Sequence, residues 1–207
     1  MIPQLERTAQ VWAITGNLGG GKTLTAVAMA YEAMKKGYFV VSNVRLNTEI
    51  MKKSIPYVED LYMHIEVQSE DVDENGNLIV REQFNPFDLP AGSPRGTRNP
   101  KRVLVILDEV AEWFDQYSNA KSVLLQRVMS WLRHSSKRNQ DVFFIVQRRE
   151  YLQKNFRLLI SRWLICDDLA TWRIPVVKIH IPFMADWCMA RTFDRAGKII
   201  NKVAYVF

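Results

Sequence analysis

The segment GNLGGGKT, residues 16–23, leaves few choices for the structure around it. It contains four glycines, and each glycine costs about 0.5 to 1 kcal/mol relative to alanine within a regular element because its backbone is so free in the unfolded chain. It follows the apolar run VWAIT and precedes KTLTAVAMAYEAMKKG, in which apolar residues recur at helical spacing. A strand, a glycine-rich turn and a helix in this order fit the pattern G-x-x-x-x-G-K-[ST], which predicts a phosphate-binding loop.

The chemistry of this loop depends on its backbone as much as on its side chains. Glycines allow successive N–H groups to point inward at phosphate oxygens, and the N-terminus of the following helix adds a positive partial charge. Lys22 is expected to reach the β- and γ-phosphates of a nucleotide, and the Thr23 hydroxyl to coordinate Mg²⁺. The residues predicted to contact the nucleotide are Gly16, Asn17, Leu18, Gly19, Gly20, Gly21, Lys22, Thr23 and Leu24.

An acidic pair, Asp108 and Glu109, follows a second apolar run, VLVIL. The carboxyl ends of parallel strands line the ligand crevice of an α/β sheet, so both carboxylates are expected to face the phosphates. Asp108 would hold Mg²⁺ through its water shell, and Glu109 would polarise the attacking water. A third run ends at Gln147, whose amide is expected to contact the γ-phosphate or the water. The structural alternatives are an acidic pair that stabilises a helix N-terminus and a strand that simply ends at solvent.

A multimeric ATPase often completes its site with an arginine from a neighbouring subunit. The sequence offers Arg133 and Arg138 in WLRHSSKRNQD, and Arg148 and Arg149 in QRRE, and it does not choose among them. Arg133 is preferred here as the catalytic arginine, although a cation near the end of a helix is also a common stabilising feature.

The order of the predicted elements defines the fold class. The strand at 10–15, the helix after it and the strand in YFVVSNV form a βαβ unit, and Gly37 is expected to end the helix. The segments RVLVILDEV, SVLLQRVMSWLRHSS, DVFFIVQ and RWLICDD continue the alternation, with further helical turns at about 149–160. We therefore predict one α/β domain over residues 1–207, with a mainly parallel central sheet flanked by helices and a C-terminal hairpin around FDRAGK.

An insertion at residues 64–101 interrupts this alternation. Two alternating segments flank Asn75-Gly76, a dipeptide that favours a tight hairpin turn. The following NPFDLPAGSPRGTRNPKR is rich in proline, glycine and arginine and is expected to be an exposed loop. Its basic residues either keep the loop in solvent or contact an anionic polymer; they are Arg95, Arg98, Lys101 and Arg102.

The overall charge favours anionic partners. The 207 residues include 28 Lys and Arg against 22 Asp and Glu, a net charge of +6, which suits nucleic acid or acidic lipid and equally a merely basic surface. The two cysteines, Cys166 and Cys188, provide neither a disulfide framework nor zinc spacing, and the first ten residues lack a cleavable apolar leader. These two features favour a reducing cytoplasm. No stretch approaches eighteen consecutive apolar residues, so we expect no transmembrane segment.

The remaining candidate residues are interpreted as structural. The histidines are too scattered to form a metal site: His64, His134 and His180. Aromatic residues at helical or strand spacing predict a core rather than a base-stacking platform, among them Trp113, Phe114 and Trp131.

Together these segments resemble the zonula occludens toxin-like ATPases of phages, part of the HerA/FtsK group of DNA-pumping P-loop ATPases that includes viral genome-packaging ATPases. The resemblance is carried by AITGNLGGGKTLTAVAMA, VVSNV, VLVILDEVAEWF, WLRHSSKRNQDVFFIVQ and LQKNFRLLISRWLI, and covers about 10–50 and 101–168. It implies a P-loop NTPase fold with ATP and Mg²⁺ as cofactors. It assigns the phosphate loop to Gly16–Thr23, the acidic pair to Asp108 and Glu109, and the sensor to Gln147, and its Arg-His pair matches Arg133 and His134.

Three functional hypotheses follow. The first is a viral or phage motor that assembles into a ring, for example a hexamer, and drives DNA into a capsid without reading its sequence, in the host cytoplasm or at the packaging vertex beside a capsid protein. The second is the cytoplasmic ATPase domain of a filamentous-phage extrusion protein, which would act at the inner membrane with a membrane partner; those relatives continue through a membrane span. The third is a small-molecule or nucleotide kinase with residues 95–102 as its lid, although a kinase seldom needs Glu109 because the acceptor hydroxyl replaces water.

Overall fold

The computed structural model describes residues 10–72, 78–82, 84–93, 101–110, 123–168, 187–194 and 196–206. The helices are α1 (Lys22–Lys35), α2 (Thr48–Lys52), η1 (Val58–Leu61), α4 (Val123–Ser135), η2 (Arg149–Tyr151) and α5 (Lys154–Arg157). The strands are β1 (Val11–Gly16), β2 (Phe39–Ser42), β3 (Tyr62–His64), β4 (Gln68–Val72), β5 (Leu78–Glu82), β6 (Val103–Leu107), β7 (Gln140–Ile145), β8 (Arg162–Asp168), β9 (Trp187–Phe193) and β10 (Ile199–Val206).

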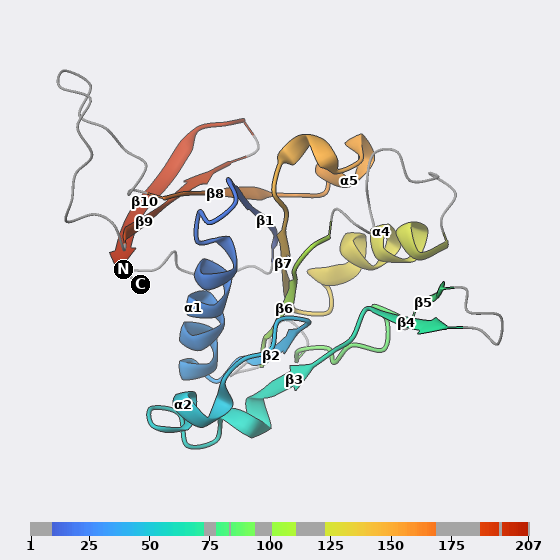
Figure 1. Ribbon diagram of the computed structural model, residues 1–207, viewed down its shortest axis with the longest axis horizontal. Helices are drawn as coiled ribbons and strands as arrows, with labels where there is room; N and C mark the ends of the chain where they lie inside the picture. Colours follow the sequence, from blue (N-terminus) through green and yellow to red (C-terminus); the bar gives the residue numbers. More distant parts are fainter. Residues whose placement is uncertain are drawn as a thin grey trace.

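A mainly parallel sheet forms the centre of the molecule (Figure 1). Within the described residues its strand order is β10-β9-β8-β1-β7-β6-β2-β3. The strands from β8 to β3 pair in parallel, whereas β9 and β10 pair antiparallel at one edge, which confirms the predicted C-terminal hairpin. The predicted inserted hairpin also exists as the antiparallel pair β4–β5, and its Asn75-Gly76 turn lies outside the described residues.

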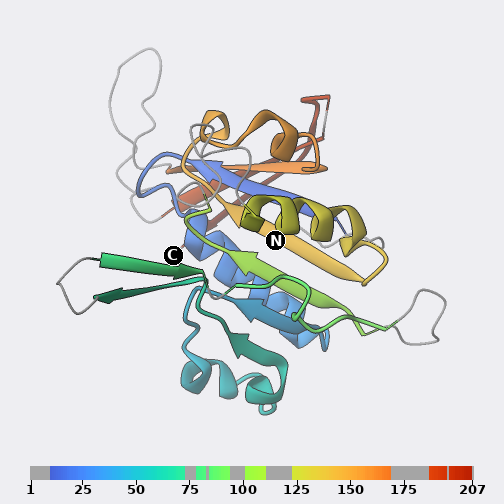
Figure 2. The ribbon, with the colours of Figure 1, turned by 90° about the vertical axis from the view of Figure 1, so that its right-hand side faces the viewer.

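Helices cover both faces of this sheet (Figures 1 and 2). α1 packs on one face over one hydrophobic cluster. α4 and α5 pack on the other face over a second cluster, which they share. Neighbouring residues of β7 serve the two clusters in turn, since Phe143 faces α1 and Phe144 faces α4 and α5. All five residues of β6 are buried, as expected for a parallel strand covered on both faces.

The end of α1 follows the sequence prediction. Gly37 adopts the left-handed region with φ +77°, and its N–H donates to the Met34 carbonyl at 2.8 Å. The N–H of Tyr38 donates to the Ala33 carbonyl at 3.0 Å. These two bonds form a Schellman motif, which satisfies carbonyls left open by the last turn and directs the chain into β2.

The described part of the predicted exposed loop, residues 85–93, is partly bound to the core, although Phe87, Asp88 and Ala91 are exposed. Phe84 and Leu89 are each only 5% exposed and belong to the core beneath α4. The Arg138 guanidinium donates to the carbonyls of Phe87 at 3.1 Å and Leu89 at 2.5 Å, and the Gln140 amide donates to the Pro90 carbonyl at 2.7 Å. The composition of this segment does not predict these contacts, because Arg138 and Gln140 lie about fifty residues further along the chain.

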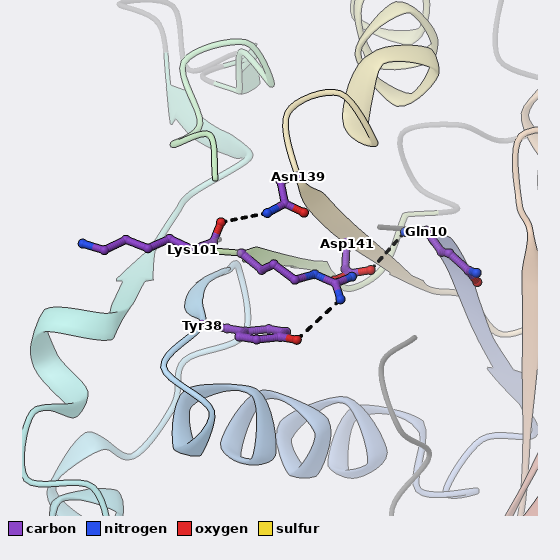
Figure 3. Close-up of polar contacts among 6 residues, drawn as sticks. Gln10, Tyr38, Lys101, Asn139 and Asp141 are labelled. Carbon is purple, nitrogen blue, oxygen red and sulfur yellow. Dashed lines mark hydrogen bonds and ion pairs between the residues drawn. The ribbon is translucent and has the colours of Figure 1, made fainter. Parts of the chain in front are cut away.

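Arg102 is a second correction, because it is buried rather than available to a polymer. It forms an ion pair with Asp141, and its guanidinium lies 5.3 Å from the centre of the Tyr38 ring. The N–H of Gln10 donates to the same carboxylate at 3.0 Å (Figure 3). Lys101 is exposed and holds Asn139 through its carbonyl at 2.9 Å, while Arg95 and Arg98 lie outside the described residues.

The aromatic prediction is confirmed for Trp131, which is fully buried and donates through Nε1 to the Gln140 side chain at 2.8 Å. Trp113, Phe114 and His180 lie outside the described residues. Among the helices that the structure describes, none combines the length and apolar character needed to cross a bilayer.

Candidate active site

The glycine loop begins where β1 meets β8. Gly16 ends β1 with φ +153°, and it pairs with Cys166 of β8. A Cβ at this position would lie 2.1 Å from the Cys166 carbonyl oxygen, a distance that real Cβ atoms do not show. Only glycine therefore allows the loop to leave the sheet at this point.

The N-terminus of α1 faces the loop without any internal neutralising group. Gly21 precedes the helix in the left-handed region, with φ +77°, and it has no side chain with which to cap. The first turn of α1 contains no acidic residue. The amide groups of this turn and the positive end of the helix dipole are therefore directed at whatever anion enters the loop.

Lys22 lies across this loop. Its ammonium donates to the carbonyl of Gly16 at 3.0 Å and to that of Asn17 at 2.9 Å. Both acceptors belong to the loop itself, so the charge is held at its mouth. A phosphate group bound by the loop amides would lie within reach of this ammonium.

Thr23 and Asp108 bring the loop and the acidic pair together. The Thr23 hydroxyl, in the first turn of α1, donates to Asp108 Oδ2 at 2.8 Å. Asp108 follows β6 directly, two strands away from β1 in the sheet. A hydroxyl and a carboxylate in contact are the hard oxygen donors that suit Mg²⁺, which usually takes only one or two protein ligands and keeps waters and phosphate oxygens for the rest. These two residues therefore fit a magnesium ion.

Asn43 holds Asp108 and was not predicted from the sequence. Its side-chain amide donates to the Asp108 carbonyl at 3.1 Å and accepts from the Asp108 N–H at 2.7 Å. The backbone pairing of β2 with β6 ends at Ser42. Beyond it, the Asn43 side chain provides hydrogen bonds between the two segments. The available signal was a polar residue directly after the buried run FVVS, next to the strand that ends in the acidic pair.

Tyr62 fixes the chain just beyond Asn43. Its hydroxyl donates to the Val44 carbonyl at 2.9 Å and accepts from the Leu46 N–H at 3.2 Å. Burial raises the pKa of the Tyr62 phenol above its ordinary value, while the Leu46 bond opposes that rise. The hydroxyl therefore stays protonated and able to donate at neutral pH.

Glu109 has an unusual backbone conformation. Its φ of +59° lies in the left-handed region, which costs a non-glycine residue on the order of 1 kcal/mol. Its N–H donates to Asp108 Oδ1 at 2.8 Å, so both oxygens of that carboxylate are engaged within the site. Strained residues of this kind often occur where side-chain direction matters.

A pocket of about 550 Å³ joins these groups. Most of the predicted site residues line it: Leu18, Gly19, Gly20, Gly21, Lys22, Thr23, Leu24, Asp108, Glu109 and Gln147. Tyr151 also lines it and was not predicted. Gly16 and Asn17, at the start of the loop, line a second cavity of about 410 Å³, and their carbonyls accept hydrogen bonds from Lys22, which lines the first pocket.

The arginine candidates do not enter the main pocket. Arg133 is exposed in the last turn of α4, which leads into the start of β7, whereas the pocket lies at the end of β7. Arg138 is bound to the carbonyls of Phe87 and Leu89 and so has a structural role. Arg148 and Arg149 line the second cavity, where the Arg149 guanidinium lies 4.6 Å from the centre of the Trp163 ring. A role for Arg133 in a neighbour's site stays a prediction.

Comparisons with known proteins agree with this arrangement. The family described as Zonular occludens toxin (Zot) matches residues 10–181. A Gene 1 protein of Enterobacteria phage I2-2 is 28% identical over 168 residues, which cover 81% of this chain and 42% of that protein. The chain therefore spans less than half the length of this relative.

Two solved structures share the fold. The N-terminal domain of zonular occludens toxin from Neisseria meningitidis aligns with a TM-score of 0.50 at 15% identity, over 97% of this chain and 94% of that domain. B204, the DNA-packaging ATPase of Sulfolobus Turreted Icosahedral Virus, aligns with a TM-score of 0.50 at 10% identity, over 93% and 96%. At these identities the similarity establishes the fold alone, that of a P-loop NTPase.

Proposed function

The chain belongs to the zonular occludens toxin (Zot) family, and we propose that it is a magnesium-dependent ATPase whose hydrolysis drives DNA translocation during phage or viral assembly. The observation that carries this proposal is the 2.8 Å contact between Thr23 and Asp108, which joins the phosphate loop to the acidic pair. A turn that only connects a strand to a helix does not require a hydrogen bond to a carboxylate 85 residues away.

Each residue of the site has a distinct task in this proposal. Lys22 and the first turn of α1 bind the β- and γ-phosphates. Glu109 accepts the proton of the attacking water, and the Gln147 amide orients that water or the γ-phosphate. Magnesium, bound by Thr23 and Asp108, would neutralise charge on the phosphate oxygens. Arg133 of a neighbouring subunit is proposed to complete the site in a ring, because it is exposed and far from the pocket of its own chain.

Hydrolysis is better supported than phosphoryl transfer to a small molecule. Glu109 lines the pocket next to Asp108, where a general base for water is required. In the kinase hypothesis, residues 95–102 form the lid. Arg102, however, is paired with Asp141 at the start of β6, whereas Asp108 and the pocket lie at the end of that strand. That arginine is therefore unavailable to an acceptor phosphate.

Two settings suit such a motor. Genome packaging, beside a capsid protein, is supported by the fold shared with B204. Phage extrusion at the inner membrane, with a membrane protein as partner, is supported by the detectable sequence similarity to phage Gene 1 proteins. The reading frame beyond codon 207 distinguishes them: an apolar membrane-spanning continuation favours extrusion, and a stop codon beside capsid genes favours packaging.

The test of the proposal is phosphate release from ATP without any acceptor. We expect release to depend on Mg²⁺ and to accelerate when DNA of unrelated sequences is added. Release that requires a small-molecule acceptor would support the kinase hypothesis instead. Hydrolysis that DNA leaves unchanged would contradict translocation while leaving the ATPase assignment intact.

A further inference from the structure

One face of the molecule combines α4 with the segment η2–α5 (Figure 2). α4 buries Leu125, Val128 and Trp131 against the sheet, and the η2–α5 segment buries Leu152 and Phe156 in the same cluster. Both elements therefore turn their other sides away from the core and toward solvent.

The solvent side of this face is strongly cationic. Its exposed or half-buried basic residues are Arg127, Arg133, Lys137, Arg148, Arg149, Lys154 and Arg157. Within residues 123–160, which are all described, the acidic residues are Asp141, which is buried against Arg102, and Glu150, which is exposed. The positive charges on this face therefore greatly outnumber the negative ones.

The opposite side of the molecule carries balanced charge. Lys35 pairs with Glu32 at 3.5 Å, at the end of α1. Lys52 pairs with Glu49 at 3.2 Å and with Glu59 at 2.6 Å, and these two carboxylates raise the pKa of the Lys52 ammonium. Among the described residues, the excess of cations is thus greater on the α4/α5 face than on the α1/α2 side.

This face is connected to the nucleotide pocket through a short stretch of chain. Gln147 and Tyr151 line the pocket, and α5 begins three residues after Tyr151. Phe156 of α5 packs edge-on against Phe144 of β7, with ring centres 4.9 Å apart. α5 thus contacts β7 three residues before Gln147, which lines the pocket.

We propose that the α4/α5 face binds the phosphate backbone of DNA and that residues 147–157 couple this contact to the nucleotide pocket. The inference rests on the proposed function and specifies the surface that a translocating motor would use. Arginine supplies five of the seven cations, and its planar guanidinium matches phosphate oxygens in pairs. Three exposed large hydrophobic side chains also occur here, Val123 in α4, Tyr151 in η2 and Leu158 at the C-cap of α5, and the basic residues are interspersed with them, whereas a membrane-binding helix concentrates its apolar residues on one side.

The test compares two triple variants that each remove three positive charges. R127Q/K154Q/R157Q alters the α4/α5 face outside the nucleotide pocket, and K36Q/R45Q/K53Q alters exposed cations on the α1/α2 side. Binding is measured by the fluorescence anisotropy of labelled single- and double-stranded oligonucleotides of unrelated sequence over a range of salt concentrations. Phosphate release is measured with and without DNA.

We expect the first variant to bind single-stranded DNA at least tenfold more weakly, with a salt slope lower by about 2, because three phosphate contacts are lost. Its basal hydrolysis should be unchanged and its stimulation by DNA lost, while the control variant behaves as wild type.

Equal losses in both variants, or wild-type DNA binding by the first, would overturn this inference alone. A wild-type protein that binds no DNA would overturn the proposed function as well. Selective loss of binding to phosphatidylglycerol vesicles, with DNA binding intact, would identify the face as a membrane contact and also overturn the inference.

Discussion

The hydroxyl of Thr23, at the start of α1, donates to the carboxylate of Asp108, at the end of β6, over 2.8 Å. The two residues are 85 positions apart in sequence, and one strand, β7, lies between β1 and β6 in the sheet. Their contact makes the phosphate loop and the acidic pair parts of one site.

Replacing Thr23 with valine keeps the shape of the side chain and removes its hydroxyl. The Asp108 carboxylate then loses this partner, and one of the two proposed protein contacts to Mg²⁺ is absent. We expect the Mg²⁺ concentration for half-maximal hydrolysis to rise about tenfold, because a hydrogen bond to a charged group contributes at least about 1.5 kcal/mol and this free energy corresponds to a factor of about ten. Titration of ATPase activity with MgCl₂ measures this, with T48V at the half-buried start of α2, outside the pocket, as the control. An unchanged Mg²⁺ requirement would contradict the assignment of Thr23.

Replacing Lys22 with alanine removes the cation at the mouth of the loop. Charge-assisted hydrogen bonds contribute about 1.5 to 3 kcal/mol each, so nucleotide affinity should fall by about 10- to 100-fold. Anisotropy of a fluorescent ATP analogue measures the affinity, and K36A, an exposed lysine just beyond α1, is the matched control. The assignment of Lys22 fails if K22A binds the analogue as tightly as K36A does.

Replacing Glu109 with glutamine retains the size of the side chain and removes its capacity to accept a proton. Hydrolysis should fall by about 10²- to 10⁴-fold while nucleotide binding persists. Single-turnover phosphate release and analogue binding, measured on the same preparation, separate the two effects. E66Q, an exposed carboxylate in an ion pair with Arg45, serves as the control. A variant E109Q that turns over at the wild-type rate would exclude Glu109 as the base.

Replacing Asn43 with alanine removes both bonds that hold the Asp108 backbone. Because Asn43 acts through the acidic pair, kcat should fall by about tenfold while KM for ATP changes little. N47A, which removes the cap of α2 instead, should affect stability without this kcat effect. The decisive readout is the double variant N43A/E109Q, which should be no slower than E109Q alone. Additive losses would mean that Asn43 acts independently of Glu109.

Replacing Arg102 with methionine leaves the Asp141 carboxylate buried without its ion-pair partner. Breaking one half of a buried pair costs about 3 to 5 kcal/mol of unfolding free energy. Urea unfolding measures the loss, and R102M/D141N should recover part of it. Nucleotide affinity of the folded protein should be unchanged, because Arg102 and Asp141 lie at the start of β6 and β7, whereas the loop follows the end of the parallel strand β1. A loss below about 1 kcal/mol would contradict a structural role for the pair.

The sequence predicted those features that depend on neighbouring residues. The glycine loop, the helix that Gly37 ends and most strands of the central sheet are local patterns that were found where they were expected, whereas the short edge strand β3 was not predicted. The juxtaposition of Asp108 with the loop was also predictable, because the carboxyl ends of parallel strands share one edge of a sheet.

The features that escaped prediction depend on partners distant in sequence. Arg102 looked like part of a basic loop, and only the pairing of β6 with β7 brings Asp141 beside it. Residues 84–93 looked polar, and only the side chains of Arg138 and Gln140 fix them to the sheet. Asn43 carries no motif of its own, since its role arises from the position of β2 next to β6.

The pocket residues come from the ends of β1, β6 and β7, elements that are widely separated along the chain. A ligand held there must bind the native arrangement far better than any unfolded one, so occupancy and global unfolding are thermodynamically linked. A nucleotide at 100 times its dissociation constant should add about 2.7 kcal/mol to the free energy of unfolding. The melting temperature therefore provides a direct measure of saturation that needs neither turnover nor DNA, even for variants that have lost all activity.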